Sequence, residues 1–421
     1  MGTLISLGVG RMEIDWGKNS FFRDHSALFK TEDIKMIPYY YVDDDGNIYT
    51  EEKEGLCRSL ASMKGRLQLL GYTLEEVRMM YNTLSAEYSK DPFNLDIPYD
   101  VFANLLKEID IDRINTPEFA KEYDENGYDL GEFVRRCIIP EKEIYDRLTK
   151  IYGEDYIFRN IALEGFFENV DPYIILRLLA ENPHCADLNV YWSYADVVED
   201  EYVSRDEIIK GLENTRKILV ITEGHSDSFV IRKTMNELYP DISDFFEFIE
   251  TRDNYPFTGT SQLLNFCCGL MKIGILNNVI VLFDNDTEGN EKYEKLMKLP
   301  QLDNMLITKL PYHVAFEQMK TRCRNSEAIE NINGEAVAIE CFLDFSSCEF
   351  EPVIQWADKY HIPGKRQGAL LRKDEYVRAF KRANLCDGSY QISKLTFLVE
   401  SILAQWKNRK KQMANKIILL F

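Results

Sequence analysis

The sequence predicts an α/β protein with a parallel sheet flanked by helices, an α-rich N-terminal domain with a small β start, and a basic helical C-terminal region. Three observations lead to this prediction. From residue 216 onward, apolar strand-like runs alternate with helix-length segments. Helical periodicity dominates most of the preceding part. Lysine and arginine are concentrated in the last part of the chain.

The first part begins with two β-rich runs, LISLGVGRMEIDW and MIPYYYVDDDGNIYT, in which DDDG is typical of a hairpin turn. Apolar residues then recur with the period of a helix in EGLCRSLASMKGRLQLL, TLEEVRMMYNTLSAEY, YDVFANLLKEI and DPYIILRLLAENP. A polar, acidic stretch before KILVIT marks a change in composition. We therefore expect an N-terminal domain over 1–212, an α/β domain over 213–350 and a basic helical region over 351–421.

The α/β domain is predicted from the order of its segments. We expect strands at 217–222, 245–250, 278–283 and 304–309, and helices at 227–239, 261–272 and 289–298. Strands separated by helices of this length form parallel sheets with right-handed crossovers.

Charge is distributed unevenly along the 421 residues. The chain has a net charge of −20, yet residues 353–421 hold 14 Lys and Arg against 5 Asp and Glu, a net of +9 that leaves −29 for the rest. The basic run KNRKK at 407–411 suits either phosphate contact or a solvated helix face. Because an acidic body repels phosphates, a nucleic-acid substrate would require metal ions or a partner.

Several classes of protein are excluded by what the sequence lacks. It has no run of the roughly 20 apolar residues that a membrane span needs, and no signal-peptide pattern at its start. Its nine cysteines show no CxxC spacing, which favours reduced thiols, a cytoplasmic location and no structural zinc. Without a GxxxxGK[ST] motif, ATP hydrolysis is not expected.

Carboxylates follow two of the predicted strands where each strand ends. KILVIT is followed by Glu223 and Gly224, with Asp227 about one helical turn later, and VIVLF is followed by Asp284 and Asp286. We expect Gly224 to allow a sharp turn. Ligands gather at the carboxyl ends of parallel strands, and carboxylates that converge there favour Mg²⁺ or Mn²⁺. Taken singly, each motif is also explained by helix capping.

The two motifs together, strand–Glu–Gly–x–x–Asp and strand–Asp–x–Asp–x–x–Gly, resemble the Toprim domain over residues 216–312. This domain occurs in topoisomerases, primases and the overcoming-lysogenization-defect nucleases. The resemblance implies that Glu223 is a general acid or base and a metal ligand, and that Asp284 and Asp286 hold Mg²⁺. It also implies that Asp227 is the additional acid of a two-metal nuclease.

Further residues of such a nuclease are sought downstream. EAVAIECFLDF offers Glu340 and Asp344 with i, i+4 spacing, and is expected to form a helix. Lys365 follows a glycine and is expected to stabilise negative charge on the phosphate, beside Arg366 as a substrate contact. His225 lies within the first acidic motif and is a third candidate contact. Solvated surface positions explain these side chains equally well.

The opening MGTLISLGVGRMEIDWGKN and the segment YWSYADVVEDEYVS resemble the bacterial HEPN/Toprim-associated family, which is found near antiviral defence genes. A HEPN ribonuclease would need an arginine closely followed by a histidine on a helix. The nearest pair is Arg177 and His184, and Pro183 disrupts helical geometry just before the histidine. We expect no ribonuclease activity from this half.

The leading hypothesis is a bacterial, cytoplasmic, metal-dependent endonuclease that uses two Mg²⁺ or Mn²⁺ ions, cleaves DNA and acts in antiviral defence. One alternative is a sensor or regulatory subunit that binds nucleic acid or a partner without cleavage. Another is an RNA-cleaving enzyme. The expected partners are nucleic acid, a separate ATPase or sensor protein, and a second copy through the apolar ISKLTFLVESILAQW segment, with no membrane.

Overall fold

The computed structural model describes residues 2–10, 12–43, 48–88, 98–111, 170–213, 217–249, 259–324, 326–358, 360 and 363–418. The chain separates into two compact units, Met1–Thr215 and Arg216–Phe421. Residues 351–421, which the sequence set apart as a third region, therefore fall within the second unit.

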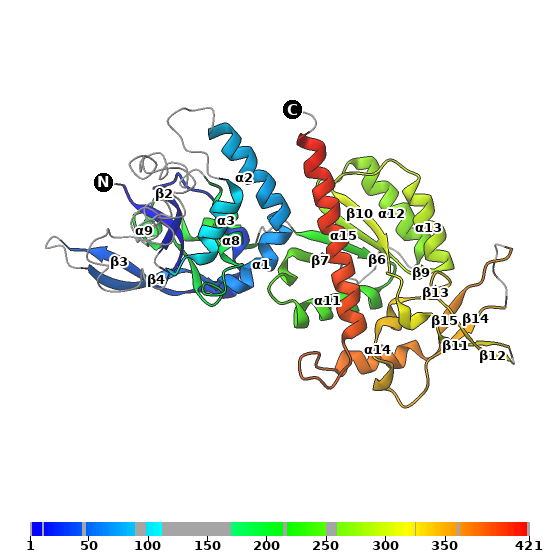
Figure 1. The fold of residues 1–421 in the computed structure, drawn as a ribbon. Coiled ribbons are helices and arrows are strands. Elements are labelled where there is room, and N and C mark those ends of the chain that lie inside the picture. The colour runs from blue at the N-terminus through cyan, green and yellow to red at the C-terminus, as the bar shows by residue number, and fades with distance from the viewer. Residues whose placement is uncertain are drawn as a thin grey trace. The chain divides into compact units, whose positions relative to one another are not determined.

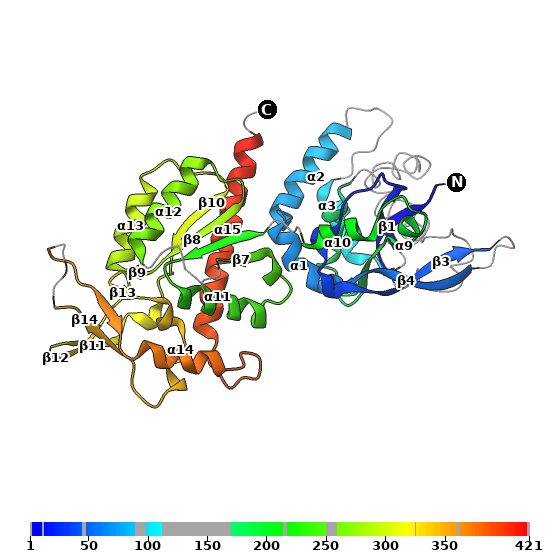
Figure 2. The same cartoon turned by 180° about the vertical axis from the view of Figure 1, so that it is seen from behind.

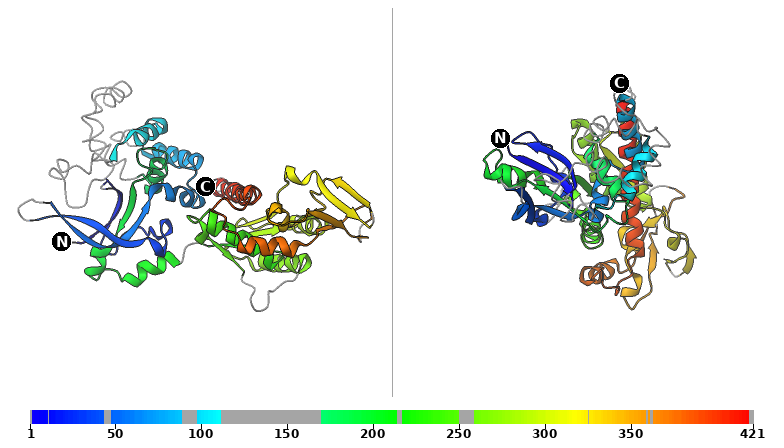
Figure 3. Two further views of the ribbon diagram at one scale, coloured as in Figure 1. Left: turned by 90° about the horizontal axis from the view of Figure 1, so that it is seen from below. Right: turned by 60° about the vertical axis from the view of Figure 1, so that its left-hand side comes forward.

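The first unit is built on a five-stranded sheet with the order β2-β1-β5-β4-β3. Every neighbouring pair in it is antiparallel, and Figure 3 shows β3 and β4 side by side. Alternate side chains of the first strand are buried, which fits the two-residue period of a strand with one face on a core. The strands are β1 (Leu4–Val9), β2 (Met12–Lys18), β3 (Ile34–Val42), β4 (Ile48–Ser59) and β5 (Asn189–Ser193).

Helices cover this sheet. The most buried is α8, which has proline at its first position and the carboxylate of Asp171 accepting a hydrogen bond from the backbone N–H of Tyr173. The α-helices of the unit are α1 (Leu60–Leu69), α2 (Leu74–Tyr88), α3 (Tyr99–Glu108), α8 (Pro172–Leu179), α9 (Ala195–Glu199) and α10 (Arg205–Glu213). Two 3-10 turns, η1 (Ser26–Leu28) and η2 (Thr31–Asp33), precede β3.

The β part of this unit is larger than the small β start that the sequence predicts. Residues 54–59, expected to begin a helix, belong to β4, because Leu56 pairs with Trp192 of β5. The strand β5 was not predicted at all. Its five residues form a strand because they pair with β1 on one side and β4 on the other. Of the DDDG motif at residues 43–46, only Asp43 lies within the described part of the chain.

The second unit contains a parallel sheet with the order β10-β8-β6-β7. Its strands are β6 (Ile218–Thr222), β7 (Phe246–Phe248), β8 (Asn278–Phe283) and β10 (Met305–Lys309). Between them lie α11 (His225–Leu238), the 3-10 turn η6 (Ser243–Phe245), α12 (Thr260–Ile273) and α13 (Thr287–Met297). The predicted order of strands and helices is thus confirmed, as is the α/β class.

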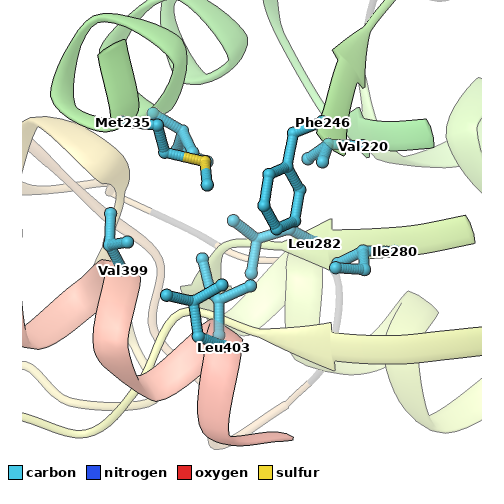
Figure 4. Close-up of a pocket in the computed structure, with 9 residues that line it drawn as sticks. Val220, Met235, Phe246, Ile280, Leu282, Val399 and Leu403 are labelled. Carbon is cyan, nitrogen blue, oxygen red and sulfur yellow. The ribbon is translucent and has the colours of Figure 1, made fainter. Parts of the chain in front are cut away.

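Each face of the parallel sheet packs on its own pair of helices. Ile221, Val281 and Phe283 share a buried cluster with side chains of α12 and α13. Val220, Ile280 and Leu282 point the other way, toward α11 and the long helix α15 (Ser393–Ile418). Figures 1 and 2 show α15 on one side of this sheet and α12 and α13 on the other. In Figure 4, Met235 of α11 and Val399 and Leu403 of α15 point toward the strands.

A smaller mixed sheet follows, with the order β12-β11-β14-β15. Its strands are β11 (Met319–Cys323), β12 (Ser326–Glu330), β14 (Val353–Trp356) and β15 (Gly368–Leu370). The 3-10 turn η7 (Val314–Phe316) comes before it, and α14 (Lys373–Arg382) comes after it. Because β14 lies parallel to β11, the region from 351 onward is tied to the preceding residues by strand pairing, and it is not wholly helical.

The helix expected over 335–345 is absent. That stretch holds β13 (Ala336–Val337), which pairs with β9 (Asn285–Asp286), and the 3-10 turns η8 (Ile339–Phe342) and η9 (Phe345–Ser347). Strand pairing with β9 competes with helix formation here, and the carboxylate of Asp344 caps η9.

Across the described residues, none of the helices has the length and apolar character that crossing a bilayer requires.

Candidate active site

Two acids meet at the carboxyl edge of the parallel sheet. β6 and β8 are adjacent parallel strands, with Thr222 opposite Leu282, so the residues that follow them, Glu223 and Asp284, emerge side by side. The backbone N–H of Asp284 donates a hydrogen bond to Oε1 of Glu223 at 3.1 Å. Two strand ends 61 positions apart in sequence are joined at this point.

Asp227 lies in the first turn of α11, and its charge acts on Glu223. It is 9% exposed, and its carboxylate accepts hydrogen bonds from the backbone N–H of Gly224 at 2.9 Å and from the hydroxyl of Ser226 at 3.3 Å. The chain bends at Glu223 and Gly224, as expected, but the φ of Gly224 is −143°, which is extended backbone that any residue adopts. A Cβ there would meet nothing closer than the Asp227 carboxylate at 3.6 Å, so the local structure does not require glycine.

Asp286 is the N-cap of α13. Its carboxylate accepts a hydrogen bond from the backbone N–H of Gly289 at 2.7 Å and another from the side-chain amide of Gln367. Gly289 itself lies against the strand end, where an added Cβ would be 2.4 Å from the carbonyl oxygen of Asp284. The last position of the second motif is therefore glycine because α13 begins in close contact with the backbone that carries Asp284.

Glu340 and Lys373 complete the group from later parts of the chain. Glu340, in η8, is 3% exposed, and its Oε1 lies 3.6 Å from Nζ of Lys373 at the first position of α14. Asp344, its predicted companion, is used elsewhere, since its carboxylate accepts hydrogen bonds from the backbone N–H groups of Ser346 and Gln391.

Lys373 was not predicted from the sequence. One feature of the sequence could have indicated this residue. It is a lysine in the first turn of a helix, where the helix dipole disfavours a cation unless acids lie nearby.

The acids act on one another electrostatically. Burial, with the charges of Asp286 and Asp227, raises the pKa of Glu223 to about 8. Burial and the charge of Glu340 raise the pKa of Asp227 to about 7. The pKa of Asp284 is raised well above its usual range by burial and then by Asp227 and Glu223. The Glu340 carboxylate, followed by Asp284 and Asp227, raises the pKa of the Lys373 ammonium. This cluster of negative charge favours a bound cation.

The carboxylate oxygens of these acids are suitable ligands for a hard cation, although the side chains as they stand do not form a metal site. All five candidate ligands offer carboxylate oxygens, which Mg²⁺ and Mn²⁺ prefer. In the part of the chain that the structure describes, however, no three His, Cys, Asp or Glu side chains are grouped closely enough to hold a metal ion as they stand. Three of the acids already accept hydrogen bonds from backbone N–H groups. Metal binding would require these side chains to reorient.

The other residues predicted to contact the substrate, His225, Lys365 and Arg366, have surroundings that differ from one another. His225 is the exposed first residue of α11, and Lys365 is exposed. Arg366 pairs with Glu330 at 2.8 Å and Glu335 at 2.7 Å, and its guanidinium lies 4.1 Å from the ring centroid of Trp356. The Arg366 side chain thus connects parts of the second unit to one another.

The basic run at 407–411 is not near the acids. Arg409 donates a hydrogen bond to the carbonyl of Leu302, just before β10, and Lys410 donates one to the side chain of Asn278 at the start of β8. Both contacts are at the amino ends of parallel strands, whereas the acids follow the carboxyl ends. The run therefore lies at the opposite edge of the sheet from the acids.

Arg177 of the first unit is only 2% exposed and forms an ion pair with Glu181 at 2.6 Å. Its guanidinium is engaged within the helical layer, in agreement with a structural role.

The family model described as HEPN/Toprim N-terminal domain 1 matches residues 1–216, just over half of the 421 residues. The chain belongs to this family. Membership of the HEPN/Toprim N-terminal domain 1 family indicates a nuclease-related role. No curated protein and no solved structure matches the chain. The matched residues correspond to the first unit, and the acids lie in the unit that follows.

Proposed function

We propose that the second unit is a Toprim-type phosphodiester hydrolase that depends on divalent metal ions and cleaves DNA. The observation that supports this most directly is the 3.1 Å hydrogen bond between Asp284 N–H and Glu223, which joins the ends of two neighbouring parallel strands. Asp227, Asp286 and Glu340 add three further carboxylates that act electrostatically on these two. Helix capping explains Asp227 and Asp286, but it does not explain why Glu223, Asp284 and Glu340 gather with them.

The five carboxylates of Glu223, Asp227, Asp284, Asp286 and Glu340 would hold the metal ions. A carboxylate has about four lone-pair sites, so those that accept backbone hydrogen bonds retain lone pairs for a cation. When bound, two Mg²⁺ or Mn²⁺ ions would activate the attacking water and stabilise the leaving oxygen.

The protein's own groups have separate roles in this proposal. Glu223 holds or takes a proton at the strand end, where burial and neighbouring acids bring its pKa to about 8. The ammonium of Lys373 stabilises negative charge on the phosphate, a role that we first assigned to Lys365. Lys373 is the better candidate because it is paired with Glu340, within the acidic group.

Supercoiled plasmid incubated with the purified chain in Mg²⁺, Mn²⁺ or EDTA tests this proposal. We expect metal-dependent nicking that falls by about 100-fold or more in Glu223→Gln and in Asp284→Asn, the loss typical of removing a key polar group. Glu294→Gln, an exposed acid of α13, is the control for the change of charge. Equal nicking by all four proteins would refute the assignment.

A non-cleaving sensor is the second candidate, and the hydrogen-bonded state of the acids favours it. Calorimetric titration with Mn²⁺ separates the two functions. Binding that is lost in Asp284→Asn, together with intact plasmid, would support the sensor. Labelled RNA in the same assay tests the alternative of an RNA-cleaving enzyme.

We further propose that the chain acts in bacterial antiviral defence together with a separate ATPase or sensor protein, as an effector that forms a homodimer. The family membership supports the nuclease-related part of this proposal. Expression in a bacterial host should lower the plating efficiency of infecting phage, and Glu223→Gln should restore it. Unchanged plating with the wild-type chain and its genomic neighbours would count against the defence role.

A further inference from the structure

We propose that Gln367 is a positioning residue of the acidic site, which orients the carboxylate of Asp286 for a divalent metal ion. This inference rests on the proposed function, because it takes Asp286 as a metal ligand. It adds a residue that was not predicted from the sequence and that acts on the metal only through Asp286.

The side chain of Gln367 bridges Asp286 and the start of α13. Its Nε2 donates a hydrogen bond to Oδ2 of Asp286, and its Oε1 accepts one from the backbone N–H of Glu288 at 3.1 Å. A backbone N–H can only donate, so Oε1 must face Glu288, and Nε2 is thereby turned toward Asp286. The contact with Asp286 joins residues 81 positions apart in the sequence.

The two carboxylate oxygens of Asp286 therefore have separate partners. Oδ1 accepts a hydrogen bond from the backbone N–H of Gly289 at 2.7 Å, and Oδ2 accepts the one from Gln367. Each oxygen has about two lone pairs, so each retains about one for a cation. Hydrogen bonds to a carboxylate favour its ionised form, which is the form that binds a metal. Partners of this kind orient metal ligands in many sites.

The backbone on either side of the Gln367 side chain is held in place by the small mixed sheet. The carbonyl of Gln367 accepts a hydrogen bond from the backbone N–H of Ala357 at 2.9 Å, and the N–H of Gly368 donates one to the carbonyl of Glu335 at 3.3 Å. An added Cβ at Gly368 would lie 2.8 Å from the ring of Trp356. The amide of Gln367 is thus carried to Asp286 by a segment that packs closely on its neighbours.

A purely structural role is the alternative, since Gln367 also caps one of the first N–H groups of α13. Gln301 provides the matched comparison at the other end of this helix. Its Nε2 donates hydrogen bonds to the carbonyls of Leu296 and Leu299, both at 2.9 Å. If Gln367 only stabilised α13, loss of either glutamine amide should affect metal binding to a similar extent.

The test compares Gln367→Met with Gln301→Met, because methionine is close to glutamine in length and lacks the amide. Calorimetric titration of the metal-free proteins with Mn²⁺ measures the affinity for the metal. Plasmid nicking over a range of Mn²⁺ concentrations gives the half-saturating concentration and the maximal rate. Hydrogen exchange on metal-free protein reports the two ends of α13, and thermal unfolding checks the fold. Gln367→Ala makes the same comparison if the methionine variant does not fold.

We expect Gln367→Met to weaken Mn²⁺ binding by about 10–100-fold, while Gln301→Met binds Mn²⁺ as the wild type does. The half-saturating concentration of Mn²⁺ for nicking should rise by the same factor, with the maximal rate largely retained. Equal Mn²⁺ affinity in the two variants would overturn the inference, and so would a lower maximal rate with unchanged half-saturation.

The outcomes for this residue and for the proposed function can be told apart. Nicking by Gln367→Met with the Mn²⁺ dependence of the wild type would sustain the proposed function and refute the role of Gln367. Weaker Mn²⁺ binding in Gln367→Met, without nicking by any of the proteins, would do the reverse. A wild-type chain that binds no Mn²⁺ would refute both.

Discussion

Replacing Gly289 by alanine should destabilise the second unit, although alanine is the better helix former. Gly289 lies in the first turn of α13, and its added Cβ would be 2.4 Å from the carbonyl oxygen of Asp284 and 3.0 Å from its carbonyl carbon. Normal contact begins near 3.4 Å, so this strand end would have to move by about 1 Å. The strand cannot give way easily, because the Asp284 N–H is bonded to Glu223.

The magnitude follows from two opposing effects. Alanine gains at most about 1 kcal/mol over glycine inside a helix. Forcing extra carbon into a packed site costs about 1–3 kcal/mol. The 2.4 Å approach to a backbone oxygen places the cost in the upper part of this range, at about 2–3 kcal/mol. Subtracting the gain of about 1 kcal/mol leaves an expected net loss of about 1–2 kcal/mol in the free energy of unfolding of this region.

The matched control is Gly224→Ala at the other acidic motif. There the Cβ would make only ordinary contact, at 3.6 Å from the Asp227 carboxylate, and the backbone is extended. Hydrogen exchange read by mass spectrometry on peptides of β8 and α13 measures the local stability, since the two units can unfold separately. Slower or unchanged exchange in Gly289→Ala would refute the reasoning, and so would a larger effect of Gly224→Ala on these peptides.

Two further predictions concern lysines. Lys373→Met should lower the initial rate of plasmid nicking by about 100-fold with the fold intact, while Lys365→Met should change that rate by no more than about twofold. A larger loss of rate in Lys365→Met than in Lys373→Met would return the role to Lys365. Burial lowers the pKa of Lys394, which donates a hydrogen bond to the carbonyl of Cys341, to about 8. Since the unfolded lysine keeps its proton up to about pH 10.4, wild-type stability should rise by about 1–3 kcal/mol between pH 8 and 10 relative to Lys394→Met. Denaturant unfolding at several pH values measures this rise. It would be excluded if the free energy of unfolding changed with pH in the same way in the two proteins.

The parallel sheet could be predicted because its signals are local. Each central strand is a short apolar run, and each connecting helix has its own period, so the order of elements follows from neighbouring residues alone. The acids that follow β6 and β8 could be paired in advance because the ends of parallel strands share one edge of the sheet.

The rest depends on partners distant in sequence. β5 is a strand because it lies between β1 and β4, and β14 is one because it pairs with β11. Residues 336–337 pair with β9, and this local strand takes the place of the expected helix. The lysine beside the acids could not be predicted either, because its position also depends on distant residues. Lys365 was favoured since it follows a glycine in the sequence, whereas Lys373 reaches Glu340 only through the packing of α14 on η8.

The spread of the acidic group along the chain has a consequence for synthesis. The acids and the lysine that pairs with Glu340 extend along the sequence from Glu223 to Lys373. One face of the sheet beneath them is covered by α15, which begins at residue 393. A polypeptide that emerges from the ribosome can hold the first strands and acids together only after these later helices have been made and packed. Whatever chemistry the site performs would therefore stay silent on the nascent chain until residues 393–418 have been made and packed.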